Sequence, residues 1–182
     1  MELNPKISKS KLSLKQALLI LMKKKRFHKI TIKELCKLAD LNRSTFYANY
    51  EDMDGLLFDI HTDFFDGIAH LLGGAKRDSQ ETGQEEYTGE LTEIINYLAA
   101  NKEIFQLLLS NNEDNLFEKN LLDYYERLYV TEKDTYIERY MFIYHSIGSF
   151  SLVRQWLQDE APCSAEELAR LICAMSDSAR ER

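Results

Sequence analysis

Residues 31–50 read TIKELCKLADLNRSTFYANY, and this stretch decides the fold of the first third of the 182-residue chain. Thr31 and Glu34, three residues apart, have the spacing of a capping box, which starts a helix. A second helix starts after Asn42, because Asn is favoured at the N-cap position. Two short helices joined by a tight turn are typical of a helix-turn-helix, a motif that lays its second helix in a DNA groove.

The apolar residues of this stretch predict which side of each helix is buried. Leu35 and Leu38 face inward in the first helix, at helical spacing. Phe46 and Tyr50, four residues apart, point back to the core from the second helix. Asp40 lies at the turn between them, where a left-handed backbone is often needed and Asp tolerates it better than most residues.

Polar side chains open the second helix: Arg43, Ser44, Thr45 and Tyr47 lie in its first turns. Arginine can pair with guanine through two hydrogen bonds, hydroxyls can reach bases or phosphates, and a threonine methyl can meet a thymine methyl. The N–H groups at a helix start also favour phosphate. An ordinary capped surface helix would share this polar start, so the pattern of the whole segment has to decide.

The charge of the chain is unevenly distributed, although its formal net charge is only -7. Residues 1–50 contain 12 Lys and Arg against 3 Asp and Glu, whereas residues 51–182 contain 11 against 27. The net charges of these two parts are +9 and -16. Such asymmetry predicts a basic module for a polyanion joined to an acidic module with another task.

The basic part resembles the DNA-binding region of the TetR family of bacterial transcriptional regulators. The residues that carry the resemblance are A-L-L-I-L-M at 17–22, F-x-x-I-T-I-K-E-L at 27–35, A-D-L-N-R-S-T-F-Y at 39–47, and Tyr50 with Leu56-Leu57. The resemblance implies that four side chains approach double-stranded DNA: Arg43, Ser44, Thr45 and Tyr47. It also implies that Thr31 and Lys33 lie near the phosphate backbone.

The sequence departs from the family pattern where the next helix starts. The family commonly has a phosphate-contacting Lys there, and the matching residue is Met53, preceded by Glu51 and Asp52. A lost cation and added negative charge weaken the expected hold on DNA. The departure motivates an alternative function, a TetR-fold adaptor or co-activator that binds another regulator.

Composition and periodicity predict an all-α protein of about nine helices. Two prolines and seven glycines are present, and the commonest residues favour helix. A polar, glycine-containing stretch at 73–86 separates two expected domains. The first is a three-helix helix-turn-helix domain at 7–68, with a linking helix at 52–72. The second is a helical regulatory and dimerisation domain at 73–182.

The last two helices are expected at 134–158 and 164–179. The first of them is apolar nearly all round, so it is buried on more than one side, either inside the domain or against a second subunit. Ser164 and Glu167 form a capping box for the last helix. A weaker resemblance of this region to one TetR subgroup implies a homodimer through the last two helices.

Tyrosines of the second domain could line a pocket for a small-molecule effector. The candidates are Tyr125, Tyr129, Tyr140 and Tyr144. Core and dimer packing with hydroxyls at the rim is the alternative explanation of the same aromatic cluster. The resemblance implies that an effector in this domain is common in the family, but these residues do not identify one.

Other site classes have no support in the sequence. No nucleophile–base set suggests catalysis, so an enzyme is not expected, and no cofactor motif is present. His61 and His70 are nine residues apart and too far around a helix to chelate one metal ion, so no metal site is expected. No apolar run is long enough to span a membrane. Three cysteines without CxxC spacing suit a reducing cytoplasm.

Together these patterns predict a TetR-like transcriptional regulator. We expect a homodimeric repressor that occupies a palindromic operator and is released by an effector, since two heads read two half-sites. The adaptor stays open as the alternative, and a helical enzyme has no catalytic set behind it.

Overall fold

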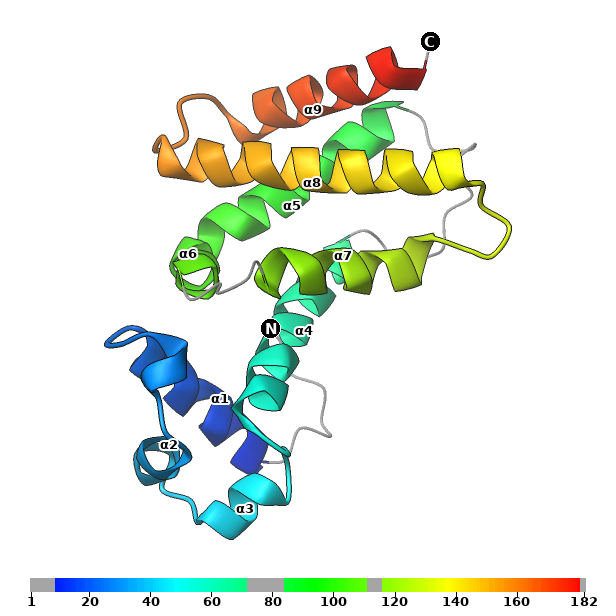
Figure 1. Ribbon diagram of the computed structural model, residues 1–182. Coiled ribbons are helices and arrows are strands. Elements are labelled where there is room, and N and C mark those ends of the chain that lie inside the picture. Colours follow the sequence, from blue (N-terminus) through cyan, green and yellow to red (C-terminus); the bar gives the residue numbers. More distant parts are fainter. Residues whose placement is uncertain (1–8, 72–83, 111–115, 181–182) are drawn as a thin grey trace. The chain divides into compact units, whose positions relative to one another are not determined.

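The computed structural model describes residues 9–71, 84–110 and 116–180, and every regular element in them is helical (Figure 1). The side chains of residues 84–87, 128–129 and 176–180 are outside this description. Residues 72–83, most of the predicted interdomain loop, also lie outside the described residues. The described helices are α1 (Lys9–Met22), η1, a 3₁₀ turn (Phe27–Lys29), α2 (Ile32–Ala39), α3 (Arg43–Tyr47), α4 (Met53–Leu71), α5 (Gln84–Ala100), α6 (Lys102–Ser110), α7 (Leu116–Tyr129), α8 (Tyr136–Gln158) and α9 (Ala165–Arg180). The predicted all-α class is confirmed.

The chain forms two compact units. Unit 1 comprises residues 1–63 and 103–117, and unit 2 comprises residues 64–102 and 118–182. Helix α4 contributes its first part to unit 1 and its last turns to unit 2. Unit 1 therefore contains the predicted helix-turn-helix together with most of α6.

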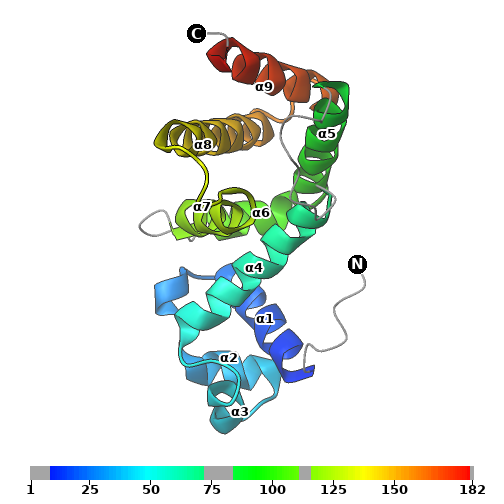
Figure 2. The ribbon, with the colours of Figure 1, turned by 90° about the vertical axis from the view of Figure 1, so that its right-hand side faces the viewer.

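In unit 1, α1 packs against α2 and α3 (Figure 2). The inward residues are large and apolar and come from all four of its N-terminal α-helices. The fully buried ones include Leu14, Leu18, Leu35, Phe46 and Leu56. Burial of each such side chain contributes about 1.5–3 kcal/mol, so this small core can hold the short α3 in place.

Leu38 does not face the core as its spacing predicts, because it is 44% exposed. The buried residues of α2 are Leu35 and Cys36, so the inward direction lies between these two neighbours. At about 100° per residue, Leu38 then lies roughly 110° from that direction. Because α2 is only eight residues long, the spacing of Leu35 and Leu38 was too little to predict which side of the helix faces the core.

A buried lysine joins α1 to α4 within unit 1. Lys15 is 6% exposed, and its Nζ lies 2.6 Å from Asp63 and 3.0 Å from Asp59. The Tyr50 hydroxyl donates to the same Asp59 carboxylate at 2.6 Å. Burial alone would raise the pKa of Asp59, but the hydrogen bonds from Tyr50 and Lys15 and the Lys11 charge lower it overall. The network fixes α1 and the end of the helix-turn-helix to α4.

Unit 2 is built around the contact of α5 with α9, and α9 also packs on α8 (Figure 1). The Trp156 indole N–H donates to the Cys163 carbonyl at 2.9 Å, which ties the end of α8 to the segment before α9. The predicted capping box of the last helix is confirmed, since Ser164 Oγ accepts from the Glu167 N–H and the Glu167 carboxylate accepts from Ser164.

Candidate nucleic-acid interface

The start of α2 is held by the predicted capping box. The Thr31 hydroxyl donates to Glu34 at 2.8 Å, and the Glu34 N–H donates back to Thr31 Oγ1 at 3.3 Å. Lys25 adds two 2.7 Å contacts to the same carboxylate. These hydrogen bonds, first from Lys25 and then from Thr31, lower the pKa of Glu34 to about 2. The predicted phosphate contact of Thr31 would therefore compete with an existing intramolecular bond.

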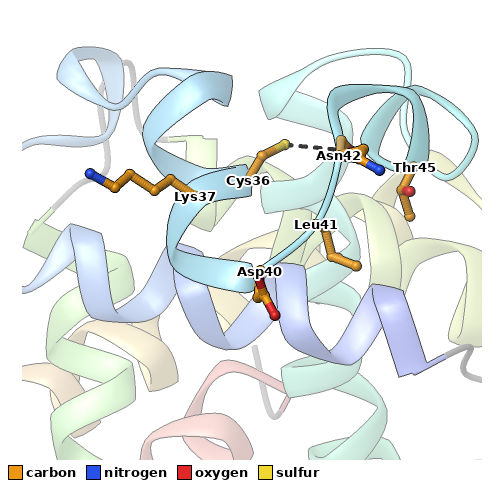
Figure 3. A pocket seen from close by; sticks show the side chains of 6 residues that line it. All are labelled: Cys36, Lys37, Asp40, Leu41, Asn42 and Thr45. Atoms are coloured by element: carbon orange, nitrogen blue, oxygen red, sulfur yellow. Dashed lines mark hydrogen bonds between the residues drawn. The ribbon is translucent and has the colours of Figure 1, made fainter.

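The turn between α2 and α3 uses the backbone conformation expected from its sequence. Asp40 ends α2 in the left-handed region, with φ 53° and ψ 47°, and the Leu41 N–H then donates to the Cys36 carbonyl at 2.9 Å. The Cys36 thiol points to the Asn42 carbonyl at 3.9 Å (Figure 3). Burial raises the pKa of this thiol, so Cys36 is a packing residue and not a reactive thiolate.

Helix α3 carries the predicted reading residues on its outer side. Arg43, Ser44 and Tyr47 are exposed, and Thr45 is half-buried. Phe46 and Tyr50 point into the core as predicted, with ring centroids 6.0 Å apart. Because Arg43 and Tyr47 are separated by one helical turn, they lie on the same face and can meet one groove together.

Asn42 occupies the N-cap position of α3, but its side chain makes no capping hydrogen bond. Its backbone carbonyl instead accepts from Thr45 and Phe46, at 3.0 and 3.2 Å. The Asn42 amide thus lines the open groove at the turn, together with Thr45 and Lys37 (Figure 3). That groove has a volume of about 450 Å³ and is open to solvent.

Two lysines lie on the exposed side of α2. Lys33 was predicted from the sequence, and Lys37 lies one turn further on, beside the turn groove. Neither forms an ion pair with any residue in the described part of the chain. Lys37 could have been added to the candidate phosphate contacts from the sequence, because it lies four residues after Lys33 and residues at this spacing share a helix face.

The start of α4 is acidic in the structure as in the sequence. Glu51, Asp52 and Asp54 are exposed, and Met53 between them is half-buried. The Asp52 carboxylate accepts from the Gly55 N–H at 2.8 Å and so caps the helix. The Asp52 carboxylate therefore has a structural role at the start of α4. This role explains why an acidic residue occurs where the family pattern would predict a contact with DNA phosphate.

The four tyrosines predicted as ligand contacts lie in different environments in unit 2. Tyr140 and Tyr144 are exposed, at 68% and 65%. Tyr125 is half-buried with a buried hydroxyl oxygen, and the side chain of Tyr129 lies outside the described residues. Tyr140 and Tyr144 therefore face outward from the single subunit, and a pocket shared by all four stays a prediction.

Comparison with known proteins places the chain among transcriptional regulators. A family described as the C-terminal region of transcriptional regulators matches residues 85–178, just over half of the chain. An uncharacterised HTH-type transcriptional regulator of Bacillus subtilis, YxbF, is 23% identical over 167 residues. The match covers 87% of this chain but only 42% of YxbF, so the chain spans less than half of that relative's length.

Solved structures share the fold. A TetR transcriptional regulator from Streptococcus agalactiae superposes with a TM-score of 0.62 at 23% identity, covering 93% of this chain and 94% of that one. The dihydroxyacetone kinase operon activator DhaS gives 0.54 at 20% identity, covering 93% and 95%. A TetR/AcrR-type regulator from Aquifex aeolicus gives 0.53 at 16% identity, covering 93% and 99%.

Among the described helices, none combines the length and apolar character needed to cross a membrane.

Proposed function

Because this chain belongs to the TetR family of transcriptional regulators, we propose that it is a DNA-binding regulator whose α3 reads the base edges of an operator. Family membership sets it among regulators and not among enzymes. The observation that carries the proposal is the outer face of α3, where Arg43 and Tyr47 are exposed one turn apart. On the opposite face of α3, Phe46 is buried and its ring packs against that of Tyr50, which follows the helix, so the reading side chains start from a fixed position.

The chemistry of this face suits the major groove. The Arg43 guanidinium can donate two hydrogen bonds to guanine, and the Ser44 hydroxyl can reach a base or a phosphate. Tyr47 is 59% exposed and adds an aromatic surface with a polar end. Lys33 and Lys37 on α2 supply cations for the phosphates that flank the groove, and such contacts position the helix without reading sequence.

The proposed active form is a homodimer through α8 and α9. Apolar side chains of α8 remain exposed at helical spacing on the single subunit: Tyr136, Ile137, Tyr140, Ile143, Tyr144 and Ile147. Leu171 and Met175, one turn apart on α9, are exposed too. Exposed apolar side chains that recur along one helix at this spacing are typical of a protein–protein interface. Two heads on one dimer would read a palindrome.

We further propose that the protein represses by occupying its operator and that an effector in unit 2 releases it. A ligand can do this only if it binds one of two head arrangements more tightly than the other. The half-buried Tyr125 is the candidate contact that faces inward. The test is a thermal-shift screen of small apolar compounds. If every compound that raises the melting temperature leaves DNA affinity unchanged, effector release is wrong.

A selection experiment tests the proposed DNA binding. Duplexes with a random 20-base-pair centre are enriched on the wild-type protein at low salt and then sequenced. We expect a palindromic consensus, because a two-fold symmetric dimer presents two identical α3 helices. Arg43→Ala should enrich no consensus, or one that has lost its guanines. A wild-type protein that enriches nothing would overturn the proposal.

A second candidate function, the adaptor, is favoured by the start of α4. Three exposed carboxylates surround Met53, and the Thr31 hydroxyl is already bonded to Glu34. These two features weaken the binding of DNA phosphate at the starts of α4 and α2, where the family commonly makes phosphate contacts. An adaptor should capture another regulator equally well when Arg43 and Tyr47 are both changed to Ala. Loss of capture in this double variant would count against it.

A further inference from the structure

The side-chain amide of Asn42 is not used inside the protein. Asn42 is exposed, and its amide forms no hydrogen bond with any residue that the structure describes. The side chain of an N-cap residue ordinarily accepts from the backbone N–H two or three residues further on. Here the Thr45 N–H, three residues on, already donates to the Asn42 backbone carbonyl at 3.0 Å. The amide is therefore available to a partner outside the chain.

The backbone that carries this amide is held on both sides of the turn. Asn42 is extended, with φ -80° and ψ 154°. Its carbonyl accepts from the Thr45 and Phe46 N–H groups on α3 and faces the Cys36 thiol of α2 at 3.9 Å. The Phe46 side chain is fully buried and anchors α3 in the core of unit 1. Because the backbone is already ordered, the amide can meet a partner without the entropic cost of ordering the chain.

Asn42 lies at the end of α3 that carries the exposed reading residues. It directly precedes Arg43 and Ser44, which are both exposed. Figure 3 shows its side chain beside Thr45, on the α3 side of the turn groove. In a helix-turn-helix, the N-terminal residues of the second helix contact the base edges. A duplex that meets Arg43 is thus within reach of the Asn42 amide.

The groups around the amide suit an uncharged base edge better than a phosphate. Lys37 and Asp40 line the turn groove with opposite charges, so these two side chains give it no net charge to attract an anion. An asparagine amide offers one acceptor, its carbonyl oxygen, and a donor, its NH2 group. Adenine alone among the four bases presents both a donor and an acceptor in the major groove, at N6 and N7.

From this available amide and its place we infer that Asn42 reads an adenine, accepting from N6 and donating to N7, close to the guanine that Arg43 reads. The inference rests on the proposed DNA-binding function and adds a specificity-determining residue to it. Consecutive Cα atoms are about 3.8 Å apart and stacked base pairs about 3.4 Å, so neighbouring side chains can contact neighbouring base pairs. Each half-site should therefore contain an adenine within two base pairs of that guanine.

The test starts from the duplex that the wild-type protein selects, in which the guanine is identified as the base that Arg43→Ala no longer enriches. In three further duplexes the nearby adenine of both half-sites is replaced by each of the other bases. Fluorescence anisotropy gives the Kd of every protein for all four duplexes. The variants are Asn42→Ala and Asn42→Ser, and serine keeps a favoured N-cap residue while it removes the amide. Asn96→Ala, at an exposed asparagine of α5, is the matched control.

We expect the wild type and Asn96→Ala to bind the three altered duplexes more weakly, by roughly five- to hundredfold per half-site, because one bidentate base contact is lost. Asn42→Ala and Asn42→Ser should bind all four duplexes with similar affinity, since neither side chain distinguishes adenine by a paired donor and acceptor. Both variants should keep the preference for the guanine. Urea unfolding checks that they are folded, and Asn42→Ala should cost little stability because no side-chain cap is lost.

The outcomes separate this inference from the proposed function. If the wild type selects a consensus without such an adenine, the inference is wrong. It is also wrong if Asn42→Ala keeps the wild-type preference for adenine. In that case an equal loss of affinity for all four duplexes would assign the amide to a phosphate, and an unchanged affinity would leave it without a DNA contact. If the wild type itself enriches no consensus, it is the proposed DNA-binding function that fails.

Discussion

At the scale of single residues, His61 gives unit 1 a dependence on pH. Its side chain is 2% exposed and its ring packs edge-on against Phe117, with centroids 5.1 Å apart. Burial lowers its pKa from the ordinary 6.5 to about 4. The folded protein therefore binds this proton less tightly than the unfolded chain. The contribution of neutral His61 to the free energy of unfolding is fully present above about pH 6.5 and is lost as the pH falls toward 4.

We predict that His61 accounts for a loss of about 3 kcal/mol in the free energy of unfolding between pH 7 and pH 4. Urea unfolding of the wild type and of His61→Gln, followed across this range, measures it. The variant should show the smaller loss, because glutamine does not titrate. The exposed His28→Gln is the matched control and should follow the wild type. Parallel curves for wild type and His61→Gln would contradict the prediction.

Lys15 shows what a single sequence cannot reveal at this scale. Its position among Leu14, Ala17 and Leu18 places it on the buried side of α1, but no residue close to it in the sequence indicates which carboxylates it contacts. Asp59 and Asp63 are more than forty residues away and come into contact only when α4 packs on α1. A buried lysine is tolerated because both carboxylates compensate its charge.

At the scale of elements, α4 and α5 approach closely in unit 2. A Cβ atom added at Gly67 would lie 2.9 Å from Cζ of the Tyr97 ring, and closer still to its hydroxyl. We predict that Gly67→Ala lowers the free energy of unfolding by about 1–2 kcal/mol, because overpacking outweighs the better helix propensity of Ala. Chemical denaturation measures the change.

Gly89 provides the matched control for this substitution. It lies within α5, and nothing lies within 4 Å of a Cβ added there. Gly89→Ala should therefore stabilise the protein by up to about 1 kcal/mol. Replacing Tyr97 by Phe in the Gly67→Ala background should recover part of the loss. Equal stability of the two alanine variants would show that α4 and α5 do not pack this closely.

Local signals were the most reliable guide to the elements. The capping boxes at Thr31 and Ser164 and the left-handed Asp40 are confirmed, because each depends on residues within one turn. The rotation of α2 was predicted incorrectly at Leu38, since tertiary packing sets the inward direction of so short a helix. The Asn42 side chain was expected to cap α3, but it makes no capping hydrogen bond.

At the scale of the whole molecule, the proposed homodimer would cover the part of α8 that is apolar and exposed. Its sequence is apolar nearly all round, and the structure leaves one part of that surface exposed on the single subunit. A helix of this kind has to be covered on more than one side. The sequence therefore predicted that this helix is covered on more than one side. It could not tell which residues lie in the core of the subunit and which are left for a second subunit, because that needs the exposure of each residue.

We predict that Tyr140→Glu with Ile143→Glu converts the protein from dimer to monomer, because burying two carboxylates in an interface is strongly unfavourable. Sedimentation equilibrium gives the mass. The control introduces two carboxylates at exposed residues of α5, Asn96→Glu with Ala100→Glu, and should leave the mass unchanged. A wild type that sediments as a monomer at micromolar concentration would contradict the proposed assembly.

The central claim is that Arg43 on α3 reads DNA sequence. The most direct test is a ratio of two dissociation constants, the Kd for a random duplex divided by the Kd for the duplex that the wild-type protein selects. Anisotropy measures this ratio for the wild type, for Arg43→Ala and for Arg127→Ala, a control in unit 2. Loss of a bidentate base contact costs about 1–3 kcal/mol of discrimination, so Arg43→Ala should lower the ratio by roughly tenfold or more per head, while Arg127→Ala keeps it. An unchanged ratio in Arg43→Ala would contradict the account.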